Sequence, residues 1–242
     1  MRVLRTIWAI WGIVVFAVLM FPALPFYLIA IAIWKQKAIL KVHWVSRLWA
    51  TGIFFFCGIR AKRIGPQKLS KNESYVLISN HQSALDIPLC AIASPNPFRF
   101  LSKAELGKIP VLGWIIKNIY LTVDRGSAQA RQRSMTKMQN ALDEGSSLFI
   151  YPEGTRNRGN TLTTRFYDGA FKLALTSEKP LGILVILNAK DLCPPKGASL
   201  SPGVLKYAWL DPIETKGMGM EQLDELKQRT KELIEDTLKK MA

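Results

Sequence analysis

The hydrophobic pattern of the chain begins with two apolar segments. Residues 7–34 contain no charged side chain, and residues 44–59 form a second apolar segment that Arg47 interrupts. One helix over the first segment, at about 1.5 Å per residue, would exceed the roughly 30 Å hydrocarbon core of a bilayer. Pro22 and Pro25 stand in its middle, and each proline removes a backbone donor and disfavours helix just before it. The first segment therefore predicts a membrane-inserted hairpin of two short helices, with a single tilted span as the alternative.

The second apolar segment predicts an amphipathic helix that packs on the membrane or on the domain. A cleaved signal peptide fits the N-terminus less well, because the apolar run continues past any plausible cleavage point. We therefore expect residues 1–65 to form membrane-anchoring helices and residues 66–242 to form a separate domain.

After Lys71 the pattern changes to short β-rich runs that alternate with segments of helical periodicity. Ser127 is a suitable N-cap for one of the helices, and Gly145 lies just beyond its end. Strands that alternate with helices predict an α/β fold, with a central mixed sheet flanked by helices. The predicted strands are residues 75–79, 99–101, 119–123, 148–151, 181–187 and 204–210, and the predicted helices are residues 127–142, 168–177 and 221–241.

The charge distribution points to an anionic partner. The chain has 33 Lys and Arg against 18 Asp and Glu, a formal net charge of +15, and no acidic residue precedes Glu73. Basic residues that bracket apolar runs are typical of proteins at anionic membrane surfaces. A nucleic-acid-binding protein would instead interleave its cations with polar groups and exposed aromatic residues. We therefore expect membrane lipid as a partner and no nucleic acid, with the basic flanks of residues 7–34 on the cytoplasmic side.

Cysteine and histidine are too sparse for a metal site. Cys57, Cys90 and Cys193 are odd in number and widely spaced, which indicates neither a disulfide framework nor zinc-ligand spacing. The only histidines are His43 and His81. We therefore expect a reducing compartment and no metal.

The segment ISNHQSALDIP, residues 78–88, places a histidine and an aspartate just after an apolar strand. On a regular helix, residues five apart point about 140° away from each other, so His81 and Asp86 can meet only if a turn intervenes. Ser83 can cap a helix that places Asp86 near its first turn. A carboxylate bound to one imidazole nitrogen leaves the other free to take a proton from an attacking hydroxyl. The alternative is a hydrogen-bonded histidine at a strand end, with Asp86 as a simple helix cap.

Two further clusters follow predicted strands. In YPEGTR, residues 151–156, Pro and Gly form a turn from which Glu153 and Arg156 project. Arg156 can hold a phosphate with two parallel hydrogen bonds, and an ordinary surface Glu–Arg pair is the alternative. The other cluster contains Lys103 and, further along, Arg125. Cations therefore recur at strand ends, as the histidine does.

Together these segments resemble the glycerophospholipid acyltransferase family, whose best-known bacterial members are 1-acylglycerol-3-phosphate acyltransferases. NHQSALD matches the N-H-x4-D of its first motif, KAELGKIPVLGWIIKNIYLTVDR resembles the second, and YPEGTR matches the third, which is usually F-P-E-G-T-R. Order and spacing agree across residues 75–188. The fourth motif usually has a second proline, which KPLGILV at residues 179–185 lacks. That motif is associated with the acyl donor, so the donor and the exact acceptor stay open.

The resemblance implies a role for each matching residue. His81 would be the general base and Asp86 its orienting partner. Arg156 would bind the acceptor's phosphate, and Lys103 would lie close by or stabilise the oxyanion formed on attack at a thioester. The residues implied at the acceptor site are Lys103, Arg125, Glu153, Gly154, Thr155 and Arg156.

The expected activity is transfer of a fatty acyl group from acyl-CoA or acyl-carrier protein to the free hydroxyl of 1-acylglycerol 3-phosphate, without a cofactor. The product would be phosphatidic acid, made at the cytoplasmic face of a bacterial inner membrane. One alternative is a different acceptor, such as lyso-ornithine lipid or another lysophospholipid. Another is a non-catalytic protein that binds anionic lipid, although lipid binding alone requires neither His81 nor Asp86. Acyl-chain length and oligomeric state stay open.

Overall fold

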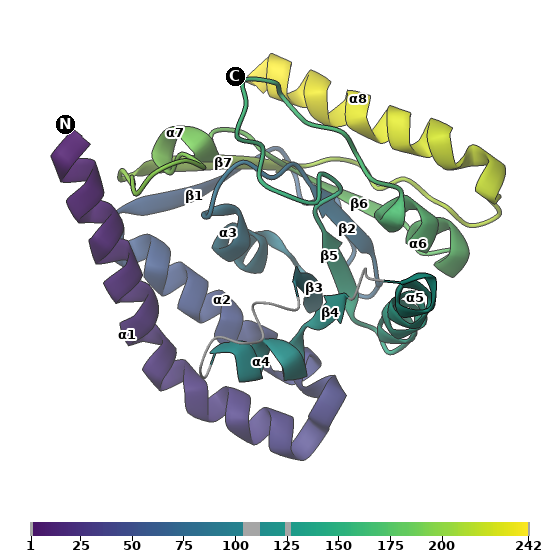
Figure 1. The fold of residues 1–242 in the computed structure, drawn as a ribbon, viewed down its shortest axis with the longest axis horizontal. Helices are drawn as coiled ribbons and strands as arrows, with labels where there is room; N and C mark the ends of the chain where they lie inside the picture. Colours follow the sequence, from purple (N-terminus) through teal and green to yellow (C-terminus); the bar gives the residue numbers. More distant parts are fainter. Residues whose placement is uncertain (1, 104–111, 124–126, 242) are drawn as a thin grey trace.

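A computed structural model describes residues 2–103, 112–123 and 127–241 of the 242-residue chain. Within these residues the chain forms a mixed sheet with helices on both faces (Figure 1). This is the α/β architecture that the alternation of strands and helices predicts.

The sheet has the strand order β1-β7-β6-β2-β5-β3-β4. Strands β6, β2, β5, β3 and β4 are parallel to one another, β7 is antiparallel to β6, and β1 is parallel to β7. All carboxyl ends of the five parallel strands therefore meet at one edge. The strands are β1 (Ile59–Ile64), β2 (Val76–Ser79), β3 (Phe98–Lys103), β4 (Leu121–Val123), β5 (Ser147–Ile150), β6 (Leu181–Ile186) and β7 (Gly203–Trp209).

The central strands alternate their side chains between two hydrophobic layers, because successive residues of a strand point to opposite faces. In β2, Val76 and Ile78 enter one layer, and Leu77 enters the other. The layer that contains Leu77 is covered by α2 (Ala38–Phe56) and α3 (Asp86–Ala93), with α1 (Arg2–Trp34) outside them. The opposite layer is covered by α5 (Ala128–Asp143), α6 (Gly169–Ser177) and α8 (Leu223–Met241). The two remaining helices are α4 (Leu112–Ile119) and α7 (Ala189–Leu192).

An N-terminal helical hairpin is present, but its turn is not where the sequence places it. Residues 7–34 do not break at the prolines; α1 runs as one helix from Arg2 to Trp34, and the turn is the 3-10 segment Lys35–Lys37. Pro22 and Pro25 both lie on the exposed side of α1. The hydrogen bonds that they remove are thus on the outer side of a helix that bends along the domain (Figure 1). On the inner side, Ala23 and Tyr27 remain packed against α2, which is why the helix continues.

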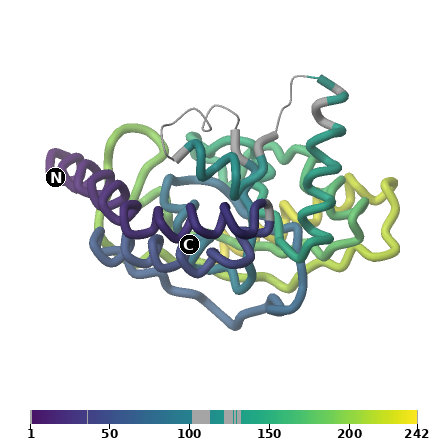
Figure 2. The backbone as a smooth tube through the Cα atoms, turned by 90° about the horizontal axis from the view of Figure 1, so that it is seen from below, coloured from purple at the N-terminus to yellow at the C-terminus, as the bar shows by residue number. Residues whose placement is uncertain are grey.

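The hairpin lies along the α/β domain. Trp8 Nε1 donates to the carbonyl of Cys57 at 3.0 Å, and the Tyr27 and Ser46 hydroxyls are 2.7 Å apart, so α1 and α2 run antiparallel. At its start, α1 accepts a backbone hydrogen bond from Leu200 at Arg5, and further along it contacts α4. Figure 2 shows the same placement from below. The domain boundary predicted after residue 65 stays a prediction, and β1, which precedes it, is already part of the sheet.

Three elements of the described structure were not predicted from the sequence pattern. Strand β1 has the sequence IRAKRI, in which only Ile59 is buried and the other residues are exposed or half-buried. It lacks a clear apolar pattern because it lies at the sheet edge. Helix α4 includes Ile119, the first residue of the strand predicted at 119–123, and that strand is shorter, at Leu121–Val123. Helix α7 is a single turn. The predicted helices at 127–142, 168–177 and 221–241 are all present, with ends shifted by one or two residues.

The C-terminal helix offers a matched pair of substitutions that tests its packing. Ile234 is fully buried in the layer under α8, whereas its neighbour Leu233 is 37% exposed. We expect Ile234→Ala to lower the free energy of unfolding by about 2–5 kcal/mol and Leu233→Ala by about 0.5 kcal/mol. Urea unfolding followed by circular dichroism measures both. Equal losses for the two variants would contradict the register of α8.

Candidate active site

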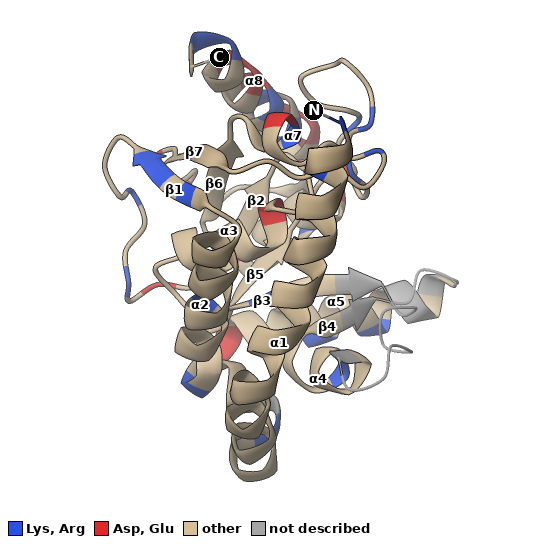
Figure 3. Cartoon of the chain, turned by 90° about the vertical axis from the view of Figure 1, so that its left-hand side faces the viewer, with Lys and Arg blue, Asp and Glu red and all other residues tan. Residues whose placement is uncertain are grey.

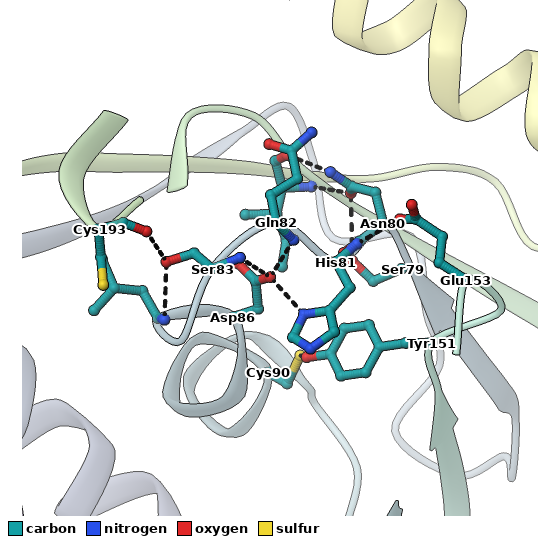
Figure 4. A network of polar contacts seen from close by, with 12 residues as sticks. Ser79, Asn80, His81, Gln82, Ser83, Asp86, Cys90, Tyr151, Glu153 and Cys193 are labelled. Atoms are coloured by element: carbon teal, nitrogen blue, oxygen red, sulfur yellow. Dashed lines mark hydrogen bonds and ion pairs between the residues drawn. The ribbon is translucent and has the colours of Figure 1, made fainter. Parts of the chain in front are cut away.

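The motif residues lie at the carboxyl edge of the sheet because they follow neighbouring parallel strands. β2 pairs with β5 so that Ile78 is opposite Ile150. His81 lies two residues after the end of β2, and the Tyr151–Arg156 loop begins directly after β5. Two segments about 70 residues apart in the chain are therefore adjacent in space, as Figure 4 shows.

His81 and Asp86 meet as the sequence predicts. The Nδ1 atom of His81 lies 2.8 Å from Oδ2 of Asp86. The Asp86 side chain is fully buried, and 13% of the His81 side chain is exposed. Within the described residues His81 Nε2 has no hydrogen-bond partner, and it is not a buried atom. One imidazole nitrogen is thus held by a carboxylate while the other faces open space.

The Asp86 carboxylate organises the whole loop. Its Oδ2 also accepts the backbone N–H groups of Gln82 at 2.7 Å and Ser83 at 2.8 Å. An oxygen that accepts two amide protons is not the donor toward His81, so Nδ1 carries the proton and Nε2 is the free lone pair. Asp86 lies in the first turn of α3, where the helix dipole stabilises a negative charge. The turn that the sequence requires between the two residues is therefore built around the carboxylate itself.

Two buried side chains tie this loop to other parts of the sheet. The Asn80 amide donates to the Ile186 carbonyl at 2.8 Å and accepts from its N–H at 2.9 Å, which locks β2 to β6. Glu153 Oε1 accepts the His81 N–H at 2.8 Å, and Oε2 accepts both the N–H and the hydroxyl of Thr164 at 2.8 Å. Glu153 is only 2% exposed. Its carboxylate therefore positions the backbone of the histidine; a direct contact with an acceptor stays a prediction.

Tyr151 packs flat against the imidazole. The two ring centroids are 3.9 Å apart with an interplanar angle of 15°. The Tyr151 hydroxyl lies 3.3 Å from Sγ of Cys90. Burial raises the pKa of both the Tyr151 phenol and the Cys90 thiol well above their usual values. Both groups are consequently neutral, and Cys90 is not a thiolate nucleophile.

Arg156 lies next to a residue that contacts this backbone. The N–H of Asn157, the next residue, donates to the His81 carbonyl at 2.7 Å. Arg156 is half-buried, and no ion pair or side-chain hydrogen bond engages it within the described residues. Gly154 has φ +67°, a conformation that favours glycine, and closes the turn by donating its N–H to the Tyr151 carbonyl. Thr155 is exposed at the tip of this turn.

The remaining predicted site residues are only partly described. Lys103 ends β3, which pairs with β5, so its backbone lies at the same sheet edge. The side chain of Lys103 and the whole of Arg125 lie outside the described residues. Their predicted contacts with an acceptor stay predictions.

Comparison with known proteins decides the family. A sequence model of the Acyltransferase family matches residues 60–186, more than half of the chain, including the His81 and Tyr151–Arg156 loops. The chain belongs to the Acyltransferase family. It is 30% identical over 203 residues to the 1-acyl-sn-glycerol-3-phosphate acyltransferase of Saccharomyces cerevisiae, covering 80% of this chain and 66% of that protein. It is 27% identical over 191 residues to the human 1-acyl-sn-glycerol-3-phosphate acyltransferase alpha, covering 77% and 66%.

The fold is shared with a solved structure. The crystal structure of the 1-acyl-sn-glycerophosphate acyltransferase from Thermotoga maritima matches with a TM-score of 0.77 at 20% sequence identity. The match covers 99% of this chain and 95% of that one. It therefore extends over the N-terminal hairpin as well as the sheet. The chain spans about two thirds of the length of the curated relatives named above.

Sequence reasoning missed the residues that hold the site together. Asn80 and Tyr151 belong to the matched motifs, but their partners, Ile186 and the His81 ring, are fixed only by strand pairing. Thr164, which shares the Glu153 carboxylate, lies in an irregular segment without any periodic signal. The tyrosine in place of the usual phenylalanine of the third motif was the one available signal for an added polar contact there.

Replacing Asp86 tests the tautomer. Asp86→Asn removes the charge that holds Nδ1–H and two loop amides, so we expect the free energy of unfolding to fall by about 1–3 kcal/mol. We also expect the ¹⁵N chemical shifts of His81 to show loss of the single Nδ1–H tautomer. Asp211→Asn is the matched control, because the Asp211 side chain is 80% exposed. Unchanged imidazole shifts in Asp86→Asn would contradict the assignment.

Proposed function

We propose that the protein transfers a fatty acyl group from a thioester donor to the free hydroxyl of 1-acylglycerol 3-phosphate, giving phosphatidic acid. The observation that carries this proposal is the imidazole held by Asp86 at Nδ1 with Nε2 free. Arg156, which has no ion pair within the described residues, directly precedes the residue whose N–H donates to the His81 carbonyl. The named relatives, all called 1-acyl-sn-glycerol-3-phosphate acyltransferases, support the acceptor. The donor is acyl-CoA or acyl-carrier protein.

The geometry suits direct transfer without an acyl-enzyme. The acceptor hydroxyl attacks the thioester carbonyl as Nε2 of His81 takes its proton, and Asp86 stabilises the imidazolium that forms. The tetrahedral intermediate then expels the thiolate, which receives the proton back from the imidazolium. Atoms and charges balance, and no nucleophilic side chain is required. The neutral, buried Cys90 is consistent with this course.

Phosphate recognition explains why a cation lies on the loop after β5. Arg156 directly precedes Asn157, whose N–H donates to the His81 carbonyl, and its guanidinium presents a fork of donors that matches a phosphate. A phosphate held there would direct a nearby glycerol hydroxyl toward the free imidazole nitrogen. A lysolipid with a different anionic headgroup is the alternative acceptor.

The N-terminal hairpin supports membrane association. Among the described residues, α1 is the one helix long and apolar enough to cross a membrane, and most of its apolar stretch is exposed. Its start is bonded to the domain through Arg5 and Trp8, so it lies along the domain rather than projecting from it. Exposed Trp11, Phe21 and Phe55 would enter the acyl region beside basic residues. We place the protein at the cytoplasmic face of a bacterial inner membrane.

An acyl-transfer assay separates the candidate acceptors. The full chain in detergent micelles is offered 1-acylglycerol 3-phosphate, other lysophospholipids and lyso-ornithine lipid, each with acyl-CoA or acyl-carrier protein. Formation of phosphatidic acid well above the other products supports the proposal. A lipid-binding protein without transfer to any acceptor would refute it.

Removing the imidazole tests the general base. We expect His81→Ala to lower kcat by about 10²- to 10⁴-fold, since general base catalysis typically contributes this much. Thermal unfolding should stay close to that of the wild type, because the Asp86 contacts with the loop amides persist. Turnover near the wild-type rate in the purified variant would remove His81 from the mechanism.

Removing the guanidinium tests phosphate binding. Arg156→Ala should raise KM for 1-acylglycerol 3-phosphate by about 10- to 100-fold, the effect of losing charge-assisted hydrogen bonds. The matched control is Arg158→Ala, two residues further on and exposed. The KM for the thioester donor should not change. If both variants shift the acceptor KM equally, the effect is general electrostatics and the assignment fails.

A further inference from the structure

A basic cavity lies beside the His81 loop, on the side of β2 away from Arg156. Its volume is about 640 Å³, and it is lined by the first turns of α1 and by residues 194–199, the loop after α7. Three of the lining residues are cations, Arg2, Arg5 and Lys196, and none is acidic. The volume is within the range of sites that bind small molecules. Figure 3 shows Lys and Arg at the N-terminal end of α1 and on the adjacent loop.

The cations of this cavity are not neutralised by carboxylates. Within the described residues no ion pair involves Arg2, Arg5 or Lys196. Arg5 Nη2 donates to the Asp191 carbonyl at 2.8 Å, which anchors one arm of the guanidinium. Its Nε is buried and has no hydrogen-bond partner. Within the described residues Arg5 Nη1 also has no hydrogen-bond partner, and it is not a buried atom, so an anion in the cavity would supply an acceptor for it.

The loop that forms the cavity wall is held at both ends. The Leu200 N–H donates to the Arg5 carbonyl at 3.0 Å, and the Ser201 N–H donates to the Leu192 carbonyl at 2.8 Å. Gly197, with φ +80°, makes the turn between them. The N-terminus of α1, with the positive end of its helix dipole, lies at the same place. The wall is therefore a built feature of the fold.

The cavity is connected to the catalytic histidine through short contacts. The Ser83 hydroxyl donates to the Cys193 carbonyl at 2.7 Å, and the next residue, Pro194, lines the cavity. The Ser83 N–H in turn donates to Asp86, the partner of His81. In the sheet, the loop 187–202 follows β6, on one side of β2, whereas Arg156 follows β5 on the other side. The His81 loop thus lies between the loop that carries Arg156 and the loop that carries Lys196.

We propose that this cavity binds the phosphate groups of the thioester donor, specifically the nucleotide phosphates of coenzyme A. The inference rests on the proposed function, which assigns the acceptor phosphate to the Arg156 side. A transfer between two phosphorylated substrates needs two anion sites flanking the base, and this cavity is the second. A concave site with three cations suits a small molecule that carries several phosphates, whereas lipid headgroups in a bilayer present a flat surface.

Nucleotide binding tests the site without relying on turnover. The full chain in detergent micelles is titrated calorimetrically with adenosine 3′,5′-bisphosphate and with coenzyme A. We expect Lys196→Ala to weaken both by about 10-fold or more, since a charged hydrogen-bonding partner is lost. Lys206→Ala, an exposed lysine on β7 outside the cavity, should bind as the wild type does. Lys196 is exposed and makes no hydrogen bond or ion pair within the described residues, so Lys196→Ala should not affect folding. Arg5→Gln is a second variant that should weaken nucleotide binding.

Steady-state kinetics and vesicle binding distinguish the sources of phosphate. We expect Lys196→Ala to raise KM for acyl-CoA by about 10-fold while KM for 1-acylglycerol 3-phosphate is unchanged. Equal nucleotide affinity in Lys196→Ala, Lys206→Ala and wild type would overturn the proposal. So would a loss confined to flotation with phosphatidylglycerol–phosphatidylcholine vesicles, which would assign the cavity to lipid headgroups, or a rise of KM confined to acyl-carrier protein. Nucleotide binding lost in Lys196→Ala, in a protein that transfers no acyl group, would uphold the cavity and refute the proposed function.

Discussion

The buried carboxylate of Asp86 is the contact on which the rest of the site depends. One oxygen accepts from the His81 ring and from two loop amides, so a single charge shapes the loop, orients the imidazole and selects its tautomer. A buried charge is tolerated only where such donors compensate its lost hydration. The start of α3 adds a favourable dipole at the same point. Loop geometry and acid–base chemistry are therefore two consequences of one interaction.

The sheet supplies the neighbours that this loop requires. Because β6, β2 and β5 are adjacent and parallel, the loops that leave them meet at one edge. Asn80, directly after β2, joins that strand to β6, and Glu153 joins the loop after β5 to the backbone of His81. The histidine is thus fixed from both sides of its strand. A base in a fixed position can take a proton from a hydroxyl group that substrate binding holds next to it. In the proposed reaction this hydroxyl belongs to the acceptor, one of the two bound substrates.

The hairpin joins a basic end near the catalytic edge to a long apolar surface. Helix α1 begins at the loop after α7, beside the cavity of Arg2, Arg5 and Lys196, and continues along the domain with most of its apolar side chains exposed. The same helix therefore contributes cations at one end and an apolar surface along its length. A substrate with phosphates at one end and a fatty chain at the other could place its phosphates near these cations and its chain along the apolar surface.

The sequence by itself determined the α/β class and the segments that become β2, β5, β6 and β7, and its match to the first motif implied the pairing of His81 with Asp86. Each of these is a local property: periodicity, a strand end, or a spacing bridged by one turn. The position of the hairpin turn, strand β1 and the contacts of Asn80, Tyr151 and Arg5 were decided only by the tertiary structure. Pro22 and Pro25 signal a helix break locally, but packing of Ala23 and Tyr27 on α2 outweighs two lost hydrogen bonds. Likewise, Arg5 and Lys196 are 191 residues apart in the chain, and no local pattern relates them; folding brings them to one cavity because α1 docks on the loop after β6.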